Sequence, residues 1–168
     1  MRKSSFPAAF LTMVISIFLT CSLPLYSKEP VKILFIGSSY FNYNNLPDIF
    51  RQLSEQGGEV LFIDQHIPSG LFLADHAEST VTRSKIKSNE WDYVILQGVG
   101  VVMAYPDMIK HHPVYPSMKS LMKTIVRNSS STQTVFCMPW AYEDGMAWKE
   151  GWSDNYDEMQ KKIINTTM

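Results

Sequence analysis

Cysteine is scarce in this sequence of 168 residues, which holds two. Cys21 lies in an apolar N-terminal segment, so the remainder of the chain contains Cys137 alone and cannot form an internal disulfide. The folded part must therefore be stabilised by packing. Cys137 lies within the apolar run TVFCM, which predicts a buried small side chain and not a reactive thiol.

The sequence also lacks an excess of charge of either sign. Its net charge is −1, and 15 basic and 16 acidic side chains are interspersed. This balance provides neither a basic footprint for nucleic acid nor an acidic tail, so we expect no nucleic-acid partner. Internal repeats and low-complexity segments are missing too, and the length suits one domain.

The first 27 residues differ in composition from the rest. Arg2 and Lys3 precede the apolar run FPAAFLTMVISIFLTCSLPL, and the polar YSKEPVK follows. This order predicts a secretory signal peptide over residues 1–27, and hence a periplasmic or extracellular protein with no stable membrane association after cleavage. A membrane anchor is the alternative, because the run approaches the ~20 residues that span a bilayer.

From residue 31 onward, apolar runs of strand length alternate with segments of helical periodicity. The strand candidates are VKILFIG, EVLFID, WDYVILQ and QTVFCMPW. The helix candidates are residues 44–58, 79–87, 115–128 and 154–168, the last with Asp154 as its N-cap. This alternation predicts an α/β fold with three α/β/α layers, and right-handed crossovers give a parallel sheet in the order 2-1-3-4.

Polar or unusual residues follow three of the predicted strands. Gly37-Ser38-Ser39 ends the first, Gln97-Gly98 the third and Pro139-Trp140 the fourth. In parallel α/β sheets, ligands bind outside the carboxyl ends of the strands, so these residues share a candidate site. Local sequence alone favours helix capping by the two serines. The alternative hypothesis is that the hydroxyl of one of these two serines is a nucleophile.

Four blocks in this order resemble the SGNH, or GDSL, hydrolases, and more closely a bacterial branch of that superfamily. The blocks are ILFIGSSYFNYNNLP, IPSGLFLADH, WDYVILQ and FCMPWAY. The resemblance covers nearly all of residues 31–168. It implies a flavodoxin-like sheet and a serine esterase that needs no cofactor, and it favours the nucleophile over the cap.

The resemblance also implies roles for individual residues. Ser39 aligns with the catalytic serine, and Ser38 stands where the family has Asp or Asn, beside the substrate. Ser39, Gly70 and Gln97 are the oxyanion donors that it implies, Gln97 standing in place of an asparagine. A backbone N–H at a strand-to-helix turn can point at a developing oxyanion, which agrees with this assignment.

The family's D-x-x-H motif, which carries the general base, is absent from this sequence. Its four histidines, His66, His76, His111 and His112, all precede the fourth strand candidate. We therefore expect the front part of a longer domain, without a fifth strand. His76 is predicted to have a structural or substrate-contact role, and the adjacent His111 and His112 are a weak metal signal, so no metal is expected.

The segment after the fourth strand candidate is rich in aromatic residues and carboxylates. Trp140 and Tyr142 are candidates for binding a sugar, although such side chains could instead cover the core. Two functions result from these patterns. One is an exported esterase acting on a small-molecule or glycan ester, in particular a carbohydrate acetyl ester. The other is a non-catalytic module that binds carbohydrate or another ligand.

Overall fold

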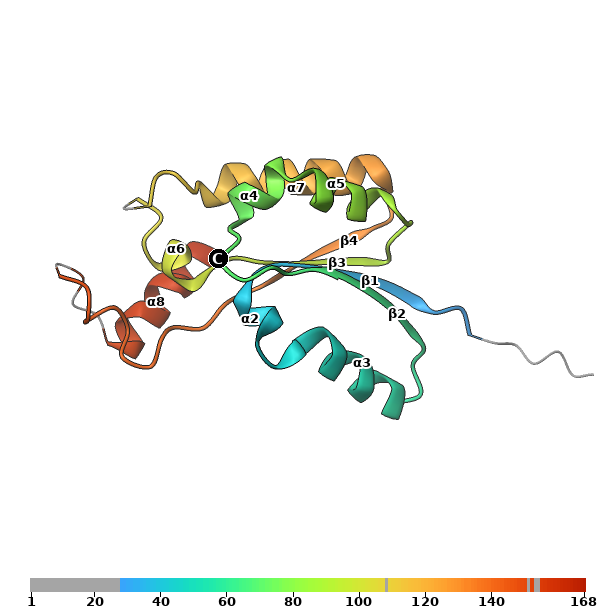
Figure 1. Ribbon diagram of the computed structural model, residues 1–168, viewed down its shortest axis with the longest axis horizontal. Coiled ribbons are helices and arrows are strands. Elements are labelled where there is room, and N and C mark those ends of the chain that lie inside the picture. The colour runs from blue at the N-terminus through green and yellow to red at the C-terminus, as the bar shows by residue number, and fades with distance from the viewer. Residues whose placement is uncertain (1–27, 108, 151, 153–154) are drawn as a thin grey trace, which may run out of the picture.

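Four parallel strands form the centre of the molecule (Figure 1). The computed structural model describes residues 28–168 except 108, 151, 153 and 154, so the predicted signal peptide lies outside the described residues. The strands pair in the order β2-β1-β3-β4, which confirms the predicted order. They are β1 (Val31–Ile36), β2 (Leu61–His66), β3 (Tyr93–Gln97) and β4 (Gln133–Cys137).

Helices cover both faces of this sheet (Figure 1). On one face lie α4 (Leu73–Glu78), α5 (Thr80–Lys87) and α7 (Val114–Asn128). The other carries α2 (Ser39–Asn42) and α3 (Leu46–Gln56), joined by a 3₁₀ turn at Tyr43–Asn45. Beyond the strand ends, α6 (Gly100–Ala104) packs against α8 (Tyr156–Thr167). The short helices α4 and α6 are not among the helices that the sequence predicts.

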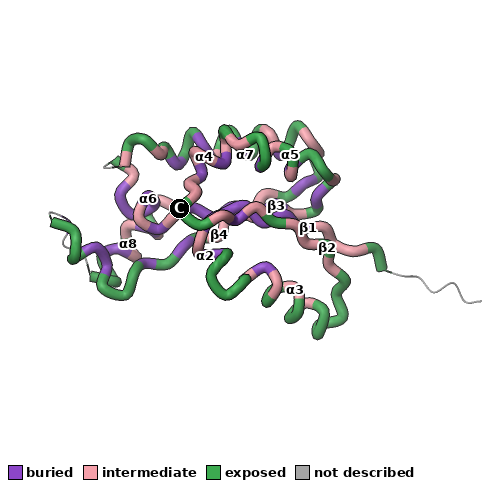
Figure 2. Tube along the Cα trace, viewed as in Figure 1, coloured by how far each residue is buried: buried purple, intermediate pink, exposed green. Residues whose placement is uncertain are grey.

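The central strand β1 explains why the sheet is covered on both sides. Leu34 and Ile36 belong to the larger core beneath α5 and α7, whereas Ile33 and Phe35 belong to a smaller core on the α3 side. All four side chains are buried, as expected for a continuous apolar strand between two layers of helices. Figure 2 shows this burial along the strands and the exposed outer surfaces of the helices.

Two helices differ in detail from the sequence prediction. The apolar face of α3 is only partly covered, with Leu53 62% exposed and Ile49 and Phe50 also exposed. At the start of α8, the Asn155 side chain accepts a hydrogen bond from the Glu158 N–H at 3.0 Å, so Asn155 is the cap. The predicted cap, Asp154, lies outside the described residues.

None of the helices in the described part of the chain combines the length and apolarity that crossing a bilayer requires.

Candidate active site

The turn between β1 and α2 places two serines at the carboxyl edge of the sheet. Ser38 is the N-terminal flank of α2 and is fully buried, and Ser39 is the first helical residue and is half-buried. Ser38 has extended backbone angles, but its side chain makes no capping bond to the helix. The Ser39 hydroxyl makes no hydrogen bond to any residue that the structure describes. Capping therefore does not account for either hydroxyl.

Gly70 lies in the loop after β2 and contacts this turn. Its N–H donates to the Ser38 Oγ at 3.1 Å. Its φ of +82° lies in the left-handed region, which glycine adopts without the strain that a side chain would cause. A second hydrogen bond joins α2 to the same loop, because the Asn42 amide donates to the Ser69 Oγ at 3.1 Å. The structure thus places Gly70 against the residue that precedes Ser39.

Gln97 lies at the end of β3 and contacts the same turn from another side. Its Oε1 accepts the Ser38 N–H at 3.0 Å, and its Nε2 donates to the Gly98 carbonyl. The side chain is only 2% exposed. Gln97 was expected to offer its amide N–H to a substrate oxyanion, but here the amide is used within the protein.

His76, on α4, lies beneath the turn with no exposed surface. Its Nε2 is 2.9 Å from the Gly37 carbonyl and its Nδ1 is 2.9 Å from the Thr82 Oγ1. Because a carbonyl can only accept, Nε2 carries the proton and Nδ1 accepts from the hydroxyl. Burial lowers the pKa of His76, against a smaller raising effect of the Gly37 bond. This placement fits the structural alternative for His76 and not a contact with substrate.

An aromatic cluster forms around Tyr40, the residue that follows Ser39. The rings of Tyr40 and Trp140 meet edge to face with centroids 4.7 Å apart, and the Tyr40 hydroxyl donates to the Trp140 carbonyl at 3.0 Å. Burial, together with the nearby Tyr142, raises the pKa of Tyr40 well above its usual range. Trp140 remains 50% exposed. The two predicted sugar-binding aromatics therefore lie beside Tyr40, which the sequence pattern did not predict as a member of this cluster.

Gly100 makes this cluster possible. A Cβ at this position would lie 2.4 Å from the Tyr40 hydroxyl oxygen and 3.1 Å from the Trp140 carbonyl oxygen. Only glycine lets the start of α6 approach the tyrosine so closely. Sequence reasoning missed Tyr40 and Gly100, although an aromatic residue directly after a candidate nucleophile was a signal that could have been used.

Among the described residues, the ring contacts of His66 and His112 are with residues other than Ser39. The His66 ring packs on the His76 ring, with centroids 5.3 Å apart, and His112 stacks on Phe72 at 3.9 Å. His111 is exposed. Within the described ranges, no group of three or more His, Cys, Asp or Glu side chains could hold a metal ion.

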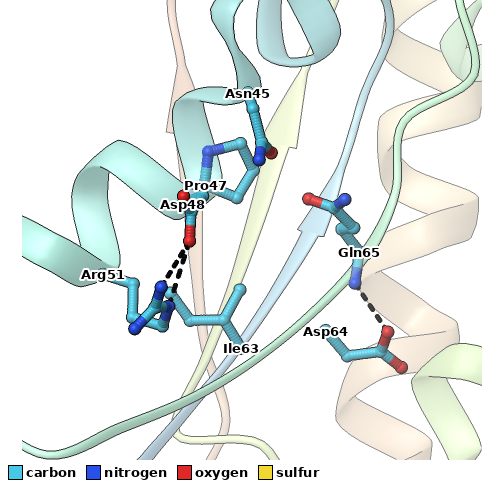
Figure 3. A pocket seen from close by; sticks show the side chains of 7 residues that line it. All are labelled: Asn45, Pro47, Asp48, Arg51, Ile63, Asp64 and Gln65. Atoms are coloured by element: carbon cyan, nitrogen blue, oxygen red, sulfur yellow. Dashed lines mark hydrogen bonds and ion pairs between the residues drawn. The ribbon is translucent and has the colours of Figure 1, made fainter.

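A separate polar pocket of about 330 Å³ lies between α3 and the edge strand β2 (Figure 3). Inside it, the Arg51 guanidinium binds Asp48 at 2.6 Å, and it also binds Glu55 at 2.7 Å outside the view. The basic side chain is thus already neutralised by acidic partners. The residues that line the pocket are Asn45, Pro47, Asp48, Arg51, Ile63, Asp64 and Gln65.

Comparison with solved structures identifies this arrangement of strands and helices. A protein from Slackia heliotrinireducens, described as a presumptive SGNH hydrolase, superposes with a TM-score of 0.64 at 21% identity. The match covers 83% of this chain and 72% of that one. The chain shares the fold of the SGNH hydrolases. No family model and no curated protein matches the sequence.

Two further solved structures have this SGNH-type fold. A DUF4886 family protein from Bacteroides uniformis has a TM-score of 0.65 at 17% identity, covering 82% of this chain and 61% of its own. A variant of an acetyl-xylooligosaccharide esterase from a Geobacillus has a TM-score of 0.51 at 14% identity, covering 81% and 71%. The chain thus spans between about three fifths and three quarters of these three proteins.

Proposed function

We propose that this chain carries the nucleophile of an exported SGNH-type serine hydrolase that cleaves ester bonds. The observation that carries the proposal is the turn at the end of β1. It leaves the half-buried Ser39 hydroxyl without a hydrogen-bond partner among the described residues, while it uses the hydroxyl and N–H of Ser38 internally. A nucleophile has to be free to meet its substrate, and Ser39 meets this condition.

The reaction follows from this position. The Ser39 oxygen attacks the ester carbonyl carbon, its proton passes to a base, and the carbonyl oxygen becomes an oxyanion. The Ser39 N–H, at the start of α2, is the first donor that we propose for this oxygen. The Gly70 N–H is the second, and it would exchange the Ser38 hydroxyl for the substrate oxygen. Collapse of the adduct breaks the bond to the alcohol oxygen, which takes up the proton held by the base, and leaves an acyl-Ser39.

The substrate class that we propose is an acetylated carbohydrate. Tyr40, the residue after Ser39, forms an edge-to-face pair with Trp140, and the half-exposed Trp140 ring offers a flat apolar face to a sugar. One solved structure with the same fold is an acetyl-xylooligosaccharide esterase, which supports this choice by analogy of fold. Export by residues 1–27 would place the protein where such polymers occur, and the N-terminal mass of secreted protein would test it.

A non-catalytic carbohydrate-binding module is the second candidate. The placement of the histidines favours this candidate, because no histidine in the described segments hydrogen-bonds the Ser39 hydroxyl and could act as its base. Such a module would bind the sugar through the same aromatic cluster without acyl transfer.

Capture of the acyl-enzyme separates the two candidates. The protein is mixed with p-nitrophenyl acetate, and intact-mass and peptide mass spectrometry locate any added acetyl group. We expect acetylation on Ser39 that disappears in Ser39→Ala. The matched control is Ser88→Ala, which removes an exposed hydroxyl bonded to the Lys85 carbonyl on α5.

A retained acetyl group in Ser39→Ala would refute the assignment of the nucleophile. Binding of an acetylated oligosaccharide without any acetylation of Ser39 would support the binding module instead.

A further inference from the structure

We propose that His76 and Gln97 are positioning residues that hold one peptide unit, Gly37–Ser38, from opposite sides and so fix the backbone that carries Ser39. The proposal rests on the proposed role of Ser39. The Gly37 carbonyl accepts from His76 Nε2 at 2.9 Å, and the Ser38 N–H donates to Gln97 Oε1 at 3.0 Å. These two groups belong to the same trans peptide, in which they point in opposite directions.

Each of the two side chains is itself held in place. His76 is bonded through Nδ1 to Thr82, which is fully buried near the start of α5. Gln97 is bonded through Nε2 to the Gly98 carbonyl. His76 and Gln97, which together we call the clamp, are almost wholly buried. Rotation of either side chain would leave polar atoms without partners in the protein interior. The clamp therefore has one arrangement of donors and acceptors.

The packing around Gly37 leaves the peptide little room to move. A Cβ on this residue would lie 2.7 Å from the Phe41 ring and 2.9 Å from Gln97 Oε1. The Gly70 N–H holds the next side chain, Ser38, at 3.1 Å. The segment that follows β2 and the end of β3 thus converge on one turn.

Ser39 has no side-chain bond of its own to the described residues, so its placement depends on this backbone. A misplacement of about 1 Å can reduce an enzymatic rate by about a hundredfold. Loosening the peptide should thus slow acylation of Ser39 even though neither clamp residue meets the substrate.

Two pairs of variants test the clamp. His76→Gln keeps an amide donor near the position of Nε2, whereas His76→Asn keeps one only near Nδ1. Gln97→Met keeps the shape but removes the acceptor. Thr132→Val is the matched control, because it removes another buried hydroxyl, which donates to the Trp91 carbonyl at 2.7 Å near the opposite sheet edge.

The first measurement is amide hydrogen exchange by NMR, expressed as the exchange rate of Ser38 relative to Leu34. This ratio cancels global destabilisation. We expect it to rise about tenfold or more in His76→Asn and Gln97→Met, and to stay near the wild-type value in His76→Gln and Thr132→Val. The second measurement is the rate of Ser39 acylation by p-nitrophenyl acetate, which should fall in the same two variants.

An unchanged exchange ratio in both His76→Asn and Gln97→Met would overturn the clamp. A raised ratio with undiminished acylation would overturn the positioning role. If the wild-type protein leaves Ser39 unacylated while the ratio still rises in the variants, the proposed nucleophile fails and the clamp on the peptide stands.

Discussion

At the scale of single residues, the buried histidine makes stability depend on pH. Burial lowers the pKa of His76 from 6.5, and the neighbouring His66 lowers it further, while Gly37 and Asp75 act in the opposite direction. The unfolded chain therefore binds a proton at a higher pH than the folded one. We expect the free energy of unfolding to increase as pH rises from the folded pKa to about 6.5, and to level off above it.

Urea unfolding at several pH values measures this increase. In His76→Gln the free energy of unfolding should depend less on pH than in the wild type. The effect of His66→Gln should be smaller, because the pKa of the half-buried His66 is lowered by burial and Lys85 but raised by Asp64. An identical pH dependence of stability in the wild type and in His76→Gln would contradict the claim that the lowered pKa of His76 causes it.

Trp140 is the residue whose removal should affect binding more than stability. Its ring is half exposed and touches Tyr40 only edge to face. Trp140→Ala should weaken binding of an acetylated oligosaccharide by about 1 kcal/mol or more and leave the melting temperature nearly unchanged. Calorimetric titration measures the affinity, and the exposed Trp148, on the same loop, provides the control Trp148→Ala.

At the scale of elements, strands were easier to predict than the contacts of their ends. The run VKILFI is short and rich in β-branched and aromatic residues, which favours a strand covered on both faces, and right-handed crossovers favour the order 2-1-3-4. By contrast, nothing in the sequence around Gln97 reveals that its amide would be used inside the protein. That contact depends on β1 and β3 being neighbours.

The apolar face of α3 shows another limit of sequence patterns. Leu46, Ile49, Phe50 and Leu53 recur at helical spacing, yet Leu53 is mostly exposed. Phe50 is exposed too, although its ring meets the Phe35 ring with centroids 5.9 Å apart. Spacing predicts which side chains share a face of a helix, but not how much of that face a neighbour covers.

Exposure on α3 leads to a prediction about stability and solubility. Leu53→Gln should change the free energy of unfolding by less than about 0.5 kcal/mol, whereas Leu121→Ala on α7, at 1% exposure, should cost about 2–5 kcal/mol. Urea unfolding compares the two variants. We also expect Leu53→Gln to raise solubility, measured as the concentration that stays in solution on salting out, since the exposed apolar surface becomes smaller. Equal destabilisation by both variants would mean that α3 is packed.

At the scale of the whole molecule, three segments distant in sequence build the candidate site. The turn after β1 supplies Ser39, the loop after β2 supplies Gly70, and the segment after β4 supplies Trp140. Parallel pairing brings their starting points to one edge of the sheet, which is why the ordered motifs could indicate a common site before any contact was known. The aromatic contact between Tyr40 and Trp140 links the first and the last of these segments.

This assembly predicts how far the reaction can proceed in the 168-residue chain. Acylation by p-nitrophenyl acetate needs little help at the leaving group, because p-nitrophenolate departs without a proton. Deacylation needs a base to activate water, and no histidine in the described part of the chain bonds to Ser39. We therefore expect a slow release of p-nitrophenol that stops near one equivalent, with acetyl-Ser39 accumulating.

Rapid-mixing absorbance and intact mass follow the two products together. Without a base, a triad site retains only about 10³–10⁴-fold acceleration over water, far below a complete enzyme. Added imidazole, acting as an external base, should raise the rate of deacylation and allow further turnover. Steady turnover that depends on Ser39 but not on imidazole would show that one of the four histidines reaches the site in solution. In that case, His66→Gln would be the first variant to test, because His66 ends the strand next to β1.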